Sequence, residues 1–240
     1  KQEPLIAQLP AKGKIVKETV NKTLGYKELT LSNGARVILK KTDFKDDQVM
    51  MQAEAKGGMS LFGKADDMNL QLISIVPSYS GLGNFLKSEL DKALAGKMAS
   101  VSIRVAEDRQ YIVRQSTPKD LETLFQLFYL TMTDVKKDDK SMASFFNLMQ
   151  TALKNKDLNH DIAYNDSVNS VQNCGNFLYL TPSVDDIQRF DYERTLQMMK
   201  QLYGNGGQFI YTIIGNFDEH QVRELLEQYI APMPQGTLAK

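Results

Sequence analysis

The chain has 240 residues, of which 42% are hydrophobic and 24% are charged. This composition suffices for one large domain or two small ones with a buried core, and it excludes a disordered chain. Lysine plus arginine equals aspartate plus glutamate, at 29 each, so the net charge is zero and no broad basic field is present for a nucleic acid. No apolar run approaches the roughly 18 residues of a membrane-spanning helix, so we expect neither a nucleic acid partner nor a membrane span.

The N-terminal part predicts a tether followed by strands. Residues 1–22 are polar, contain two prolines and show no sustained period, so we interpret them as a tether. YKELTL and ARVILKK then flank a turn in which Asn33 and Gly34 supply the positive φ angles of a tight hairpin. A third strand is expected over residues 48–58, and it stops at paired glycines. Helical spacing follows over residues 65–76.

The remaining sequence alternates between helical and strand patterns. Thr117 followed by Pro118 is typical of a helix start, and Asp218 is expected to cap the last helix. Residues 159–176 are rich in asparagine and serine, which indicates a helix with a polar face and then a loop. The other expected elements are helices in NFLKSELDKALAG, 117–133, 138–157 and Tyr192–Tyr203, and strands in SVSIRVA, RQYIVRQS and QFIYTIIGNF.

The order of these elements predicts the fold class. About six strands form short antiparallel runs, and most helices lie in the second half. We therefore expect an α+β fold with a mainly antiparallel sheet and helices packed on one side. The predicted division is a tether at 1–22, a single domain at 23–234 and the start of a C-terminal linker at 235–240.

The chain contains two histidines that could ligate a metal. A hydrolytic zinc site needs three protein ligands and a water, whereas His160 and His220 are 60 positions apart in the sequence. We interpret both as surface or capping residues. An independent enzyme that brings them together with an acid in the folded chain stays open as a third possibility. The stretch NFDEH mimics His-x-x-Glu-His, with Asn in the first position. However, the zinc motif must lie within a helix, and NFDEH lies where a strand ends and a helix begins.

Other chemically interesting residues have simple interpretations. Cys174 is the single cysteine and is expected to be an ordinary buried or half-buried side chain. Paired acids such as Asp66-Asp67 and Asp185-Asp186 fall at predicted turns and helix starts, where carboxylates cap amides. We expect Met198 and Met199 to be adaptable core residues. The residues therefore predict no catalytic, metal-binding or cofactor-binding site.

Several motifs in order carry a resemblance to a known family. They are ELTLSNGARVILKKTDFKDDQV, GGMSLFGKADD, STPKDLETLFQLFYLTMT, LTPSVDDIQRFD and FIYTIIGNFDEHQVRELLEQYI. This succession, over residues 26–234, resembles the pitrilysin/insulinase family of zinc metallopeptidases, the inverzincins. It is most similar to the first domain of the second half of the large bacterial members. The resemblance implies the processing-peptidase-like domain fold.

The resemblance also carries an expectation about activity. In catalytic domains of the family, the helix after the third strand carries His-x-x-Glu-His. Here residues 65–76 read ADDMNLQLISIV, which contains no histidine or glutamate, so none of the functional positions can be carried over. The resemblance thus implies a catalytically inactive domain, with the zinc of the parent endopeptidase held in another domain.

The family's architecture implies partners as well. Four such domains form two halves that close around an extended peptide, so the expected partners are the other domains of the same polypeptide and the peptide substrate. The resemblance favours localisation in the periplasm or cell envelope of a bacterium. The alternative is a structural or peptide-binding module, like the inactive partner subunits of processing peptidases.

Overall fold

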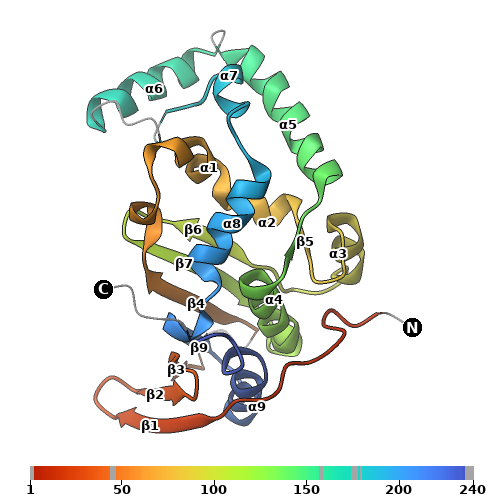
Figure 1. The fold of residues 1–240 in the computed structure, drawn as a ribbon. Coiled ribbons are helices and arrows are strands. Elements are labelled where there is room, and N and C mark those ends of the chain that lie inside the picture. Colours follow the sequence, from red (N-terminus) through yellow and green to blue (C-terminus); the bar gives the residue numbers. More distant parts are fainter. Residues whose placement is uncertain (1–2, 44–46, 157–158, 174–177, 179, 236–240) are drawn as a thin grey trace.

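The computed structural model describes residues 3–43, 47–156, 159–173, 178 and 180–235, and its centre is a mixed seven-stranded sheet (Figure 1). Along the sheet the strand order is β1-β2-β3-β9-β4-β7-β6. A second sheet pairs β5 with β8. The strands are β1 (Ile15–Asn21), β2 (Tyr26–Leu31), β3 (Arg36–Lys41), β4 (Val49–Lys56), β5 (Gly81–Leu82), β6 (Ser102–Val105), β7 (Arg109–Ser116), β8 (Val135–Lys136) and β9 (Ile210–Gly215).

Nine α-helices occur in the described part of the chain. They are α1 (Asp67–Leu72), α2 (Val76–Tyr79), α3 (Lys87–Ala93), α4 (Leu121–Thr133), α5 (Asp139–Lys154), α6 (His160–Gln172), α7 (Val184–Ile187), α8 (Tyr192–Tyr203) and α9 (Glu219–Leu225). A π-helical turn, Leu226–Ile230, continues α9. Short 3₁₀ turns lie at Gly58–Leu61, Lys64–Asp66, Ile73–Ile75, Pro118–Asp120 and Gly206–Gln208. No helix of this set is both long and apolar enough to cross a membrane.

Strand β9 joins the N-terminal hairpin to the rest of the sheet. It runs parallel to β3, with Arg36 opposite Ile210, and antiparallel to β4, whereas every other neighbouring pair in the sheet is antiparallel. The predicted β2–β3 hairpin forms, and Gly34 has a positive φ of 90°. However, the Gly34 N–H donates to the Leu31 carbonyl at 2.9 Å, so Ser32 and Asn33 are the central residues of the turn. Asn33 is buried and donates to the backbone oxygens of Ile230 and Met233. The first hairpin is thereby fixed to the C-terminal end of the described chain.

One face of the sheet is buried beneath helices. Alternate residues such as Val37, Met51 and Tyr211 are fully buried, whereas their neighbours along each strand are half-buried or exposed. Helix α4 packs on α8 and on the 226–230 turn, and Figure 1 shows α4, α8 and α9 in front of the sheet. This confirms the predicted α+β class. The main sheet has one strand more than the six expected, and the two-residue strands β5 and β8 gave no sequence signal.

The predicted tether at 1–22 is wrong for residues 15–21, which form β1. This edge strand pairs with β2, and Glu18 accepts a hydrogen bond from Arg223 at 3.0 Å. The side chains of Val16 and Val20 are 62% and 55% exposed, so β1 lacks the alternation that reveals a half-buried strand. Backbone hydrogen bonds to β2 hold β1 in the sheet, and backbone hydrogen bonds produce no side-chain pattern from which a strand can be predicted.

The helix predicted over 65–76 is present but broken. A 3₁₀ turn at Ile73–Ile75 separates α1 from α2. Pro77 lies in the first turn of α2 and has no N–H to donate to the carbonyl of Ile73, so regular α-helical hydrogen bonding is interrupted at this point. Other predicted starts and helices are confirmed: Thr117 accepts from the Asp120 N–H, α6 forms within the asparagine-rich segment, and α8 spans Tyr192–Tyr203.

Candidate functional site

The paired glycines after β4 bring the chain against the turn between β6 and β7. Gly57 and Gly58 have φ angles of 142° and 62°. A Cβ at Gly58 would lie 2.3 Å from the carbonyl oxygen of Ala106, so no other residue fits there. The Gly58 N–H donates to the Gln110 side chain at 2.8 Å. The close approach at both glycines is explained by packing of the chain against its own β6–β7 turn and Gln110.

Helix α1 occupies the place that the family resemblance gives to the catalytic helix. Met68, Leu70 and Leu72 are all 5% exposed or less, so the helix is part of the core. At the start of the helix, Asp66 and Asn69 are also buried. Helix α1 therefore combines an apolar face that packs in the core with a buried carboxylate at its start. A buried carboxylate needs a hydrogen-bonding or charged partner.

The partner of the carboxylate comes from α8. Arg194 Nη2 lies 2.8 Å from Asp66 Oδ2, and Arg194 Nε donates to Asp66 Oδ1 at 3.1 Å. Asn69 donates its side-chain amide to Asp66 Oδ1 at 3.1 Å, and its own oxygen accepts from the Asp191 N–H at 2.8 Å. We call Asp66, Asn69, Asp191 and Arg194 the Asp66 cluster. It joins the start of α1 to the start of α8.

The electrostatics of the Asp66 cluster favour the ion pair. Hydrogen bonds from Arg194 hold the pKa of Asp66 below its ordinary value, although burial acts in the opposite direction. The same hydrogen bonds raise the pKa of the Arg194 guanidinium. Both groups are therefore charged at neutral pH, and both oxygens of Asp66 accept from the guanidinium.

The Asp66 cluster is better suited to a structural role than to acid–base catalysis. A general acid or base works best with a pKa near the working pH, and the pKa of Asp66 is shifted away from neutrality. Within the described ranges, no three His, Cys, Asp or Glu side chains lie close enough together to hold a metal ion. The Asp66 cluster was not predicted, because Asp66 and Arg194 are 128 positions apart and each resembles an ordinary helix residue locally.

The two histidines do not meet. His160 is the first residue of α6 and His220 lies in the first turn of α9, and both are exposed. Figure 1 places α6 and α9 at opposite ends of the molecule. In the NFDEH stretch, Asp218 accepts from the Gln221 N–H and Glu219 pairs with Lys27 at 3.0 Å. These residues start a helix, as predicted, and they do not form part of a zinc motif.

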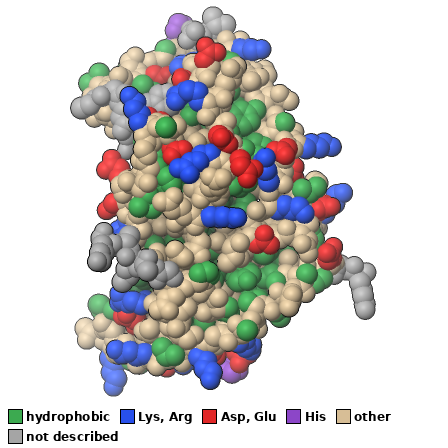
Figure 2. All heavy atoms as spheres, in the orientation of Figure 1, with side chains coloured by type: hydrophobic (Ala, Val, Ile, Leu, Met, Phe, Trp, Pro, Cys, Tyr) green, Lys and Arg blue, Asp and Glu red, His purple; other side chains and the backbone are tan. Residues whose placement is uncertain are grey.

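The remaining candidates also have structural roles. Asp186 forms a capping box with Ser183 at the start of α7. Met198 and Met199 are buried in the core. Cys174 lies outside the described residues, so the prediction about its burial is not tested. Figure 2 shows acidic and basic side chains interspersed over one face of the molecule, without a single-sign field.

Comparisons with known proteins place these observations in a family context. No family model matches the chain. The chain is 24% identical over 234 residues to a protein of Arabidopsis thaliana named zinc protease PQQL-like, a match that covers 97% of this chain and 22% of that protein. The chain therefore spans about a quarter or less of the length of the curated relatives that it matches.

Solved structures give the same answer for the fold. The periplasmic protease PqqL from Escherichia coli superposes with a TM-score of 0.77 at 23% identity, over 98% of this chain and 26% of that chain. A peptidase M16 inactive domain from Pseudomonas fluorescens superposes with a TM-score of 0.66 at 15% identity, over 90% and 52%. The relatives and the structural neighbours together confirm the resemblance of this chain to the pitrilysin-type family of zinc metallopeptidases.

Proposed function

We propose that this chain is a non-catalytic domain of a zinc-dependent endopeptidase. In this role it helps to form the wall of a closed peptide-binding chamber and docks on the other domains of the polypeptide. One observation carries the proposal: α1, at the place of the catalytic helix, has no histidine or glutamate, and its buried carboxylate is held by Arg194. A helix released from metal binding is free to use apolar residues for packing.

The zinc and the catalytic groups then belong to another domain of the longer protein. The relatives named as zinc proteases are several times longer than this chain, which leaves room for such a domain. The part played by the present chain is architectural. A rigid core fixes the surfaces that face the peptide and the neighbouring domains.

The test compares this chain with the full-length polypeptide that contains it. Both are passed through gel filtration after zinc loading, and their metal content and their cleavage of a quenched peptide pool are measured. We expect zinc and cleavage in the full-length polypeptide alone. The variant His160→Ala/His220→Ala of the full-length polypeptide is the matched control, and it should retain both properties. Zinc held stoichiometrically by this chain would overturn the proposal.

A second function is a structural or peptide-binding module with no protease in the same polypeptide. The likeness to a domain described as inactive supports this alternative. The two functions differ in one feature of the full-length sequence. A His-x-x-Glu-His motif on the corresponding helix of another domain favours the protease, and a full-length polypeptide that lacks the motif and binds no zinc favours the module.

A further inference from the structure

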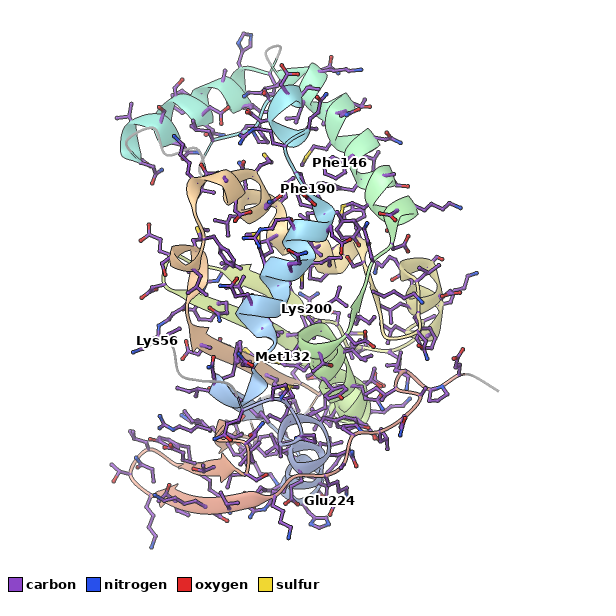
Figure 3. All side chains as sticks on the ribbon, in the orientation of Figure 1. Lys56, Met132, Phe146, Phe190, Lys200 and Glu224 are labelled. Carbon is purple, nitrogen blue, oxygen red and sulfur yellow. The ribbon has the colours of Figure 1, made fainter. Side chains whose placement is uncertain are left out.

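Helices α5 and α6 project from the body of the domain (Figure 1). In α5 the buried residues are Met142 and Phe145, both in its first half, and α6 has no buried residue in 13. The base of α5 is anchored by aromatic rings, since the Phe146 ring lies 5.2 Å from that of Phe190, which precedes α8 (Figure 3). In the second half of α5, Met149 and Leu153 are half-buried against the core, while the exposed face of that half and all of α6 extend beyond the aromatic anchor. We call α5 and α6 together the helical arm.

The middle of each helix of the helical arm carries almost no charge, whereas Asp139, Lys140, Lys154 and Asp161 lie near the helix ends. Residues 141–153 contain no Asp, Glu, Lys or Arg, and residues 162–172 contain one, Asp166. Asp166 is already engaged, because it lies 3.3 Å from Lys156 Nζ and accepts from the Thr181 N–H at 2.9 Å. The whole chain is 24% charged, so several charges would be expected over such a length of exposed helix.

Apolar side chains take the place of charges on the outer face of the arm. Leu148 on α5 is 69% exposed, and Tyr164 and Val171 on α6 are 70% and 82% exposed. Tyr164 and Val171 are seven positions apart, which puts them two turns apart on one side of the helix. Small and uncharged polar residues fill the exposed positions around them: Ala143, Ser144, Asn147, Thr151, Ala152, Ala163, Asn165, Ser167 and Gln172.

Helix α9 shows what a solvated helix of this chain looks like. Its exposed or half-buried positions include Glu219, Arg223 and Glu224, which form ion pairs with the N-terminal part of the chain. Residues 141–153 and 162–172 of the helical arm have the opposite composition. Depletion of charges together with exposed aromatic and aliphatic side chains is typical of the centre of a protein interface, where water is excluded.

We propose that the helical arm is an interdomain surface, covered by another domain of the same, longer polypeptide through an uncharged face with apolar side chains. This inference rests on the proposed function, because it needs further domains beside this one. The length of the relatives supports this occupant over a separate protein. A domain on the same polypeptide is present at a high effective concentration, so a small, neutral surface suffices to hold it.

Hydrogen exchange tests the proposal directly. The amides of α6 and of the second half of α5 are compared in this chain alone and in the full-length polypeptide. We expect them to exchange at least about tenfold more slowly in the full-length polypeptide, because the covering domain suppresses local opening. The amides of α9 are the internal control and should change little. Equal exchange of the arm in the two proteins would overturn the proposal.

A pair of charge substitutions separates docking from folding. The variant Leu148→Lys/Tyr164→Lys should restore rapid exchange of the arm in the full-length polypeptide. In the chain alone it should leave the thermal unfolding midpoint within about 2 °C, since both side chains are largely exposed. The matched control Val16→Lys/Val20→Lys puts the same charges on β1, at 62% and 55% exposure, and should leave exchange of the arm unchanged.

Two outcomes distinguish this inference from others. If the chain alone forms a dimer that the arm variant dissociates, a second copy covers the arm and the assignment to another domain is overturned. Zinc content and peptide cleavage are measured on the same samples. Protection of the arm in a full-length polypeptide without zinc would support the interdomain surface while overturning the proposed protease function.

Discussion

Helices α8 and α6 have nearly the same length, 12 and 13 residues, yet they relate to the molecule in opposite ways. Helix α8 buries five residues, including Met198 and Tyr203, and keeps charged residues such as Glu193 and Lys200 on its outer side. Helix α6 buries none, and its Asp, Glu, Lys or Arg residues are limited to Asp161 in the first turn and Asp166. The comparison teaches that α8 is completed by this domain, whereas the partner that would complete α6 is not among the described residues.

The largest expected effect is a difference in the free energy of unfolding between side-chain truncations in α8 and in α6. Met198→Ala removes a fully buried side chain of α8 and should lower the free energy of unfolding by about 2–5 kcal/mol, through lost burial and a cavity. Val171→Ala in α6 should change it by less than about 0.5 kcal/mol. Urea unfolding followed by circular dichroism measures both. Similar losses in the two variants would contradict the contrast between the helices.

The next effect concerns the Asp66 cluster, which ties α8 to α1. Asp66→Asn removes the charge that pairs with Arg194, and we expect a loss of about 1–3 kcal/mol at pH 7. The pKa of Asp66 is lowered in the folded chain, so its stabilising contribution is present above the pKa of an unfolded aspartate, about 3.9, and is lost as the pH falls below that value.

The pH dependence gives this second prediction its control. The difference in free energy of unfolding between the native chain and Asp66→Asn should be constant from about pH 5 to pH 8 and should shrink as the pH falls below about 4. Denaturant unfolding at a series of pH values measures it. A difference that grows toward low pH would mean that the folded state favours the protonated carboxyl, and the ion pair would then be rejected.

A smaller effect separates the two helix starts. Asp191 caps α8 by accepting from the Arg194 N–H, and Asn159 caps α6 by accepting from the Asp161 and Ile162 N–H groups. Asp191→Ala should lower the global free energy of unfolding by about 1 kcal/mol. Asn159→Ala should leave global stability almost unchanged and should speed hydrogen exchange within α6 alone. Equal global losses would show that α6 is as integral to the domain as α8.

The sequence predicted those features that depend on neighbouring residues. The extent of α8, the caps at Thr117 and Asp218 and the hairpin at Asn33-Gly34 all follow from local spacing and capping chemistry. Features that join distant segments were missed. The parallel pairing of β3 with β9 and the Asp66–Arg194 pair have no local signal, and β1 has no buried side to reveal it.

The same distinction applies to the candidate site. The absence of a His-x-x-Glu-His motif from residues 65–76 could be read directly, because a metal site needs particular side chains at fixed spacing. The pairing of Asp66 with Arg194 at the start of α1 could not be predicted, since Arg194 comes from a helix far along the chain. The uncharged composition of residues 141–153 was visible in the sequence. It became informative once the structure placed those residues on a projecting helix.

The most direct test of the central claim is a zinc titration of this chain, followed by gel filtration and metal analysis. The account predicts far less than one zinc ion per chain, in the native chain and in His160→Ala/His220→Ala alike. One tightly held zinc ion per chain, with a dissociation constant below micromolar, would show that this domain carries a metal site of its own. The non-catalytic assignment would then be contradicted.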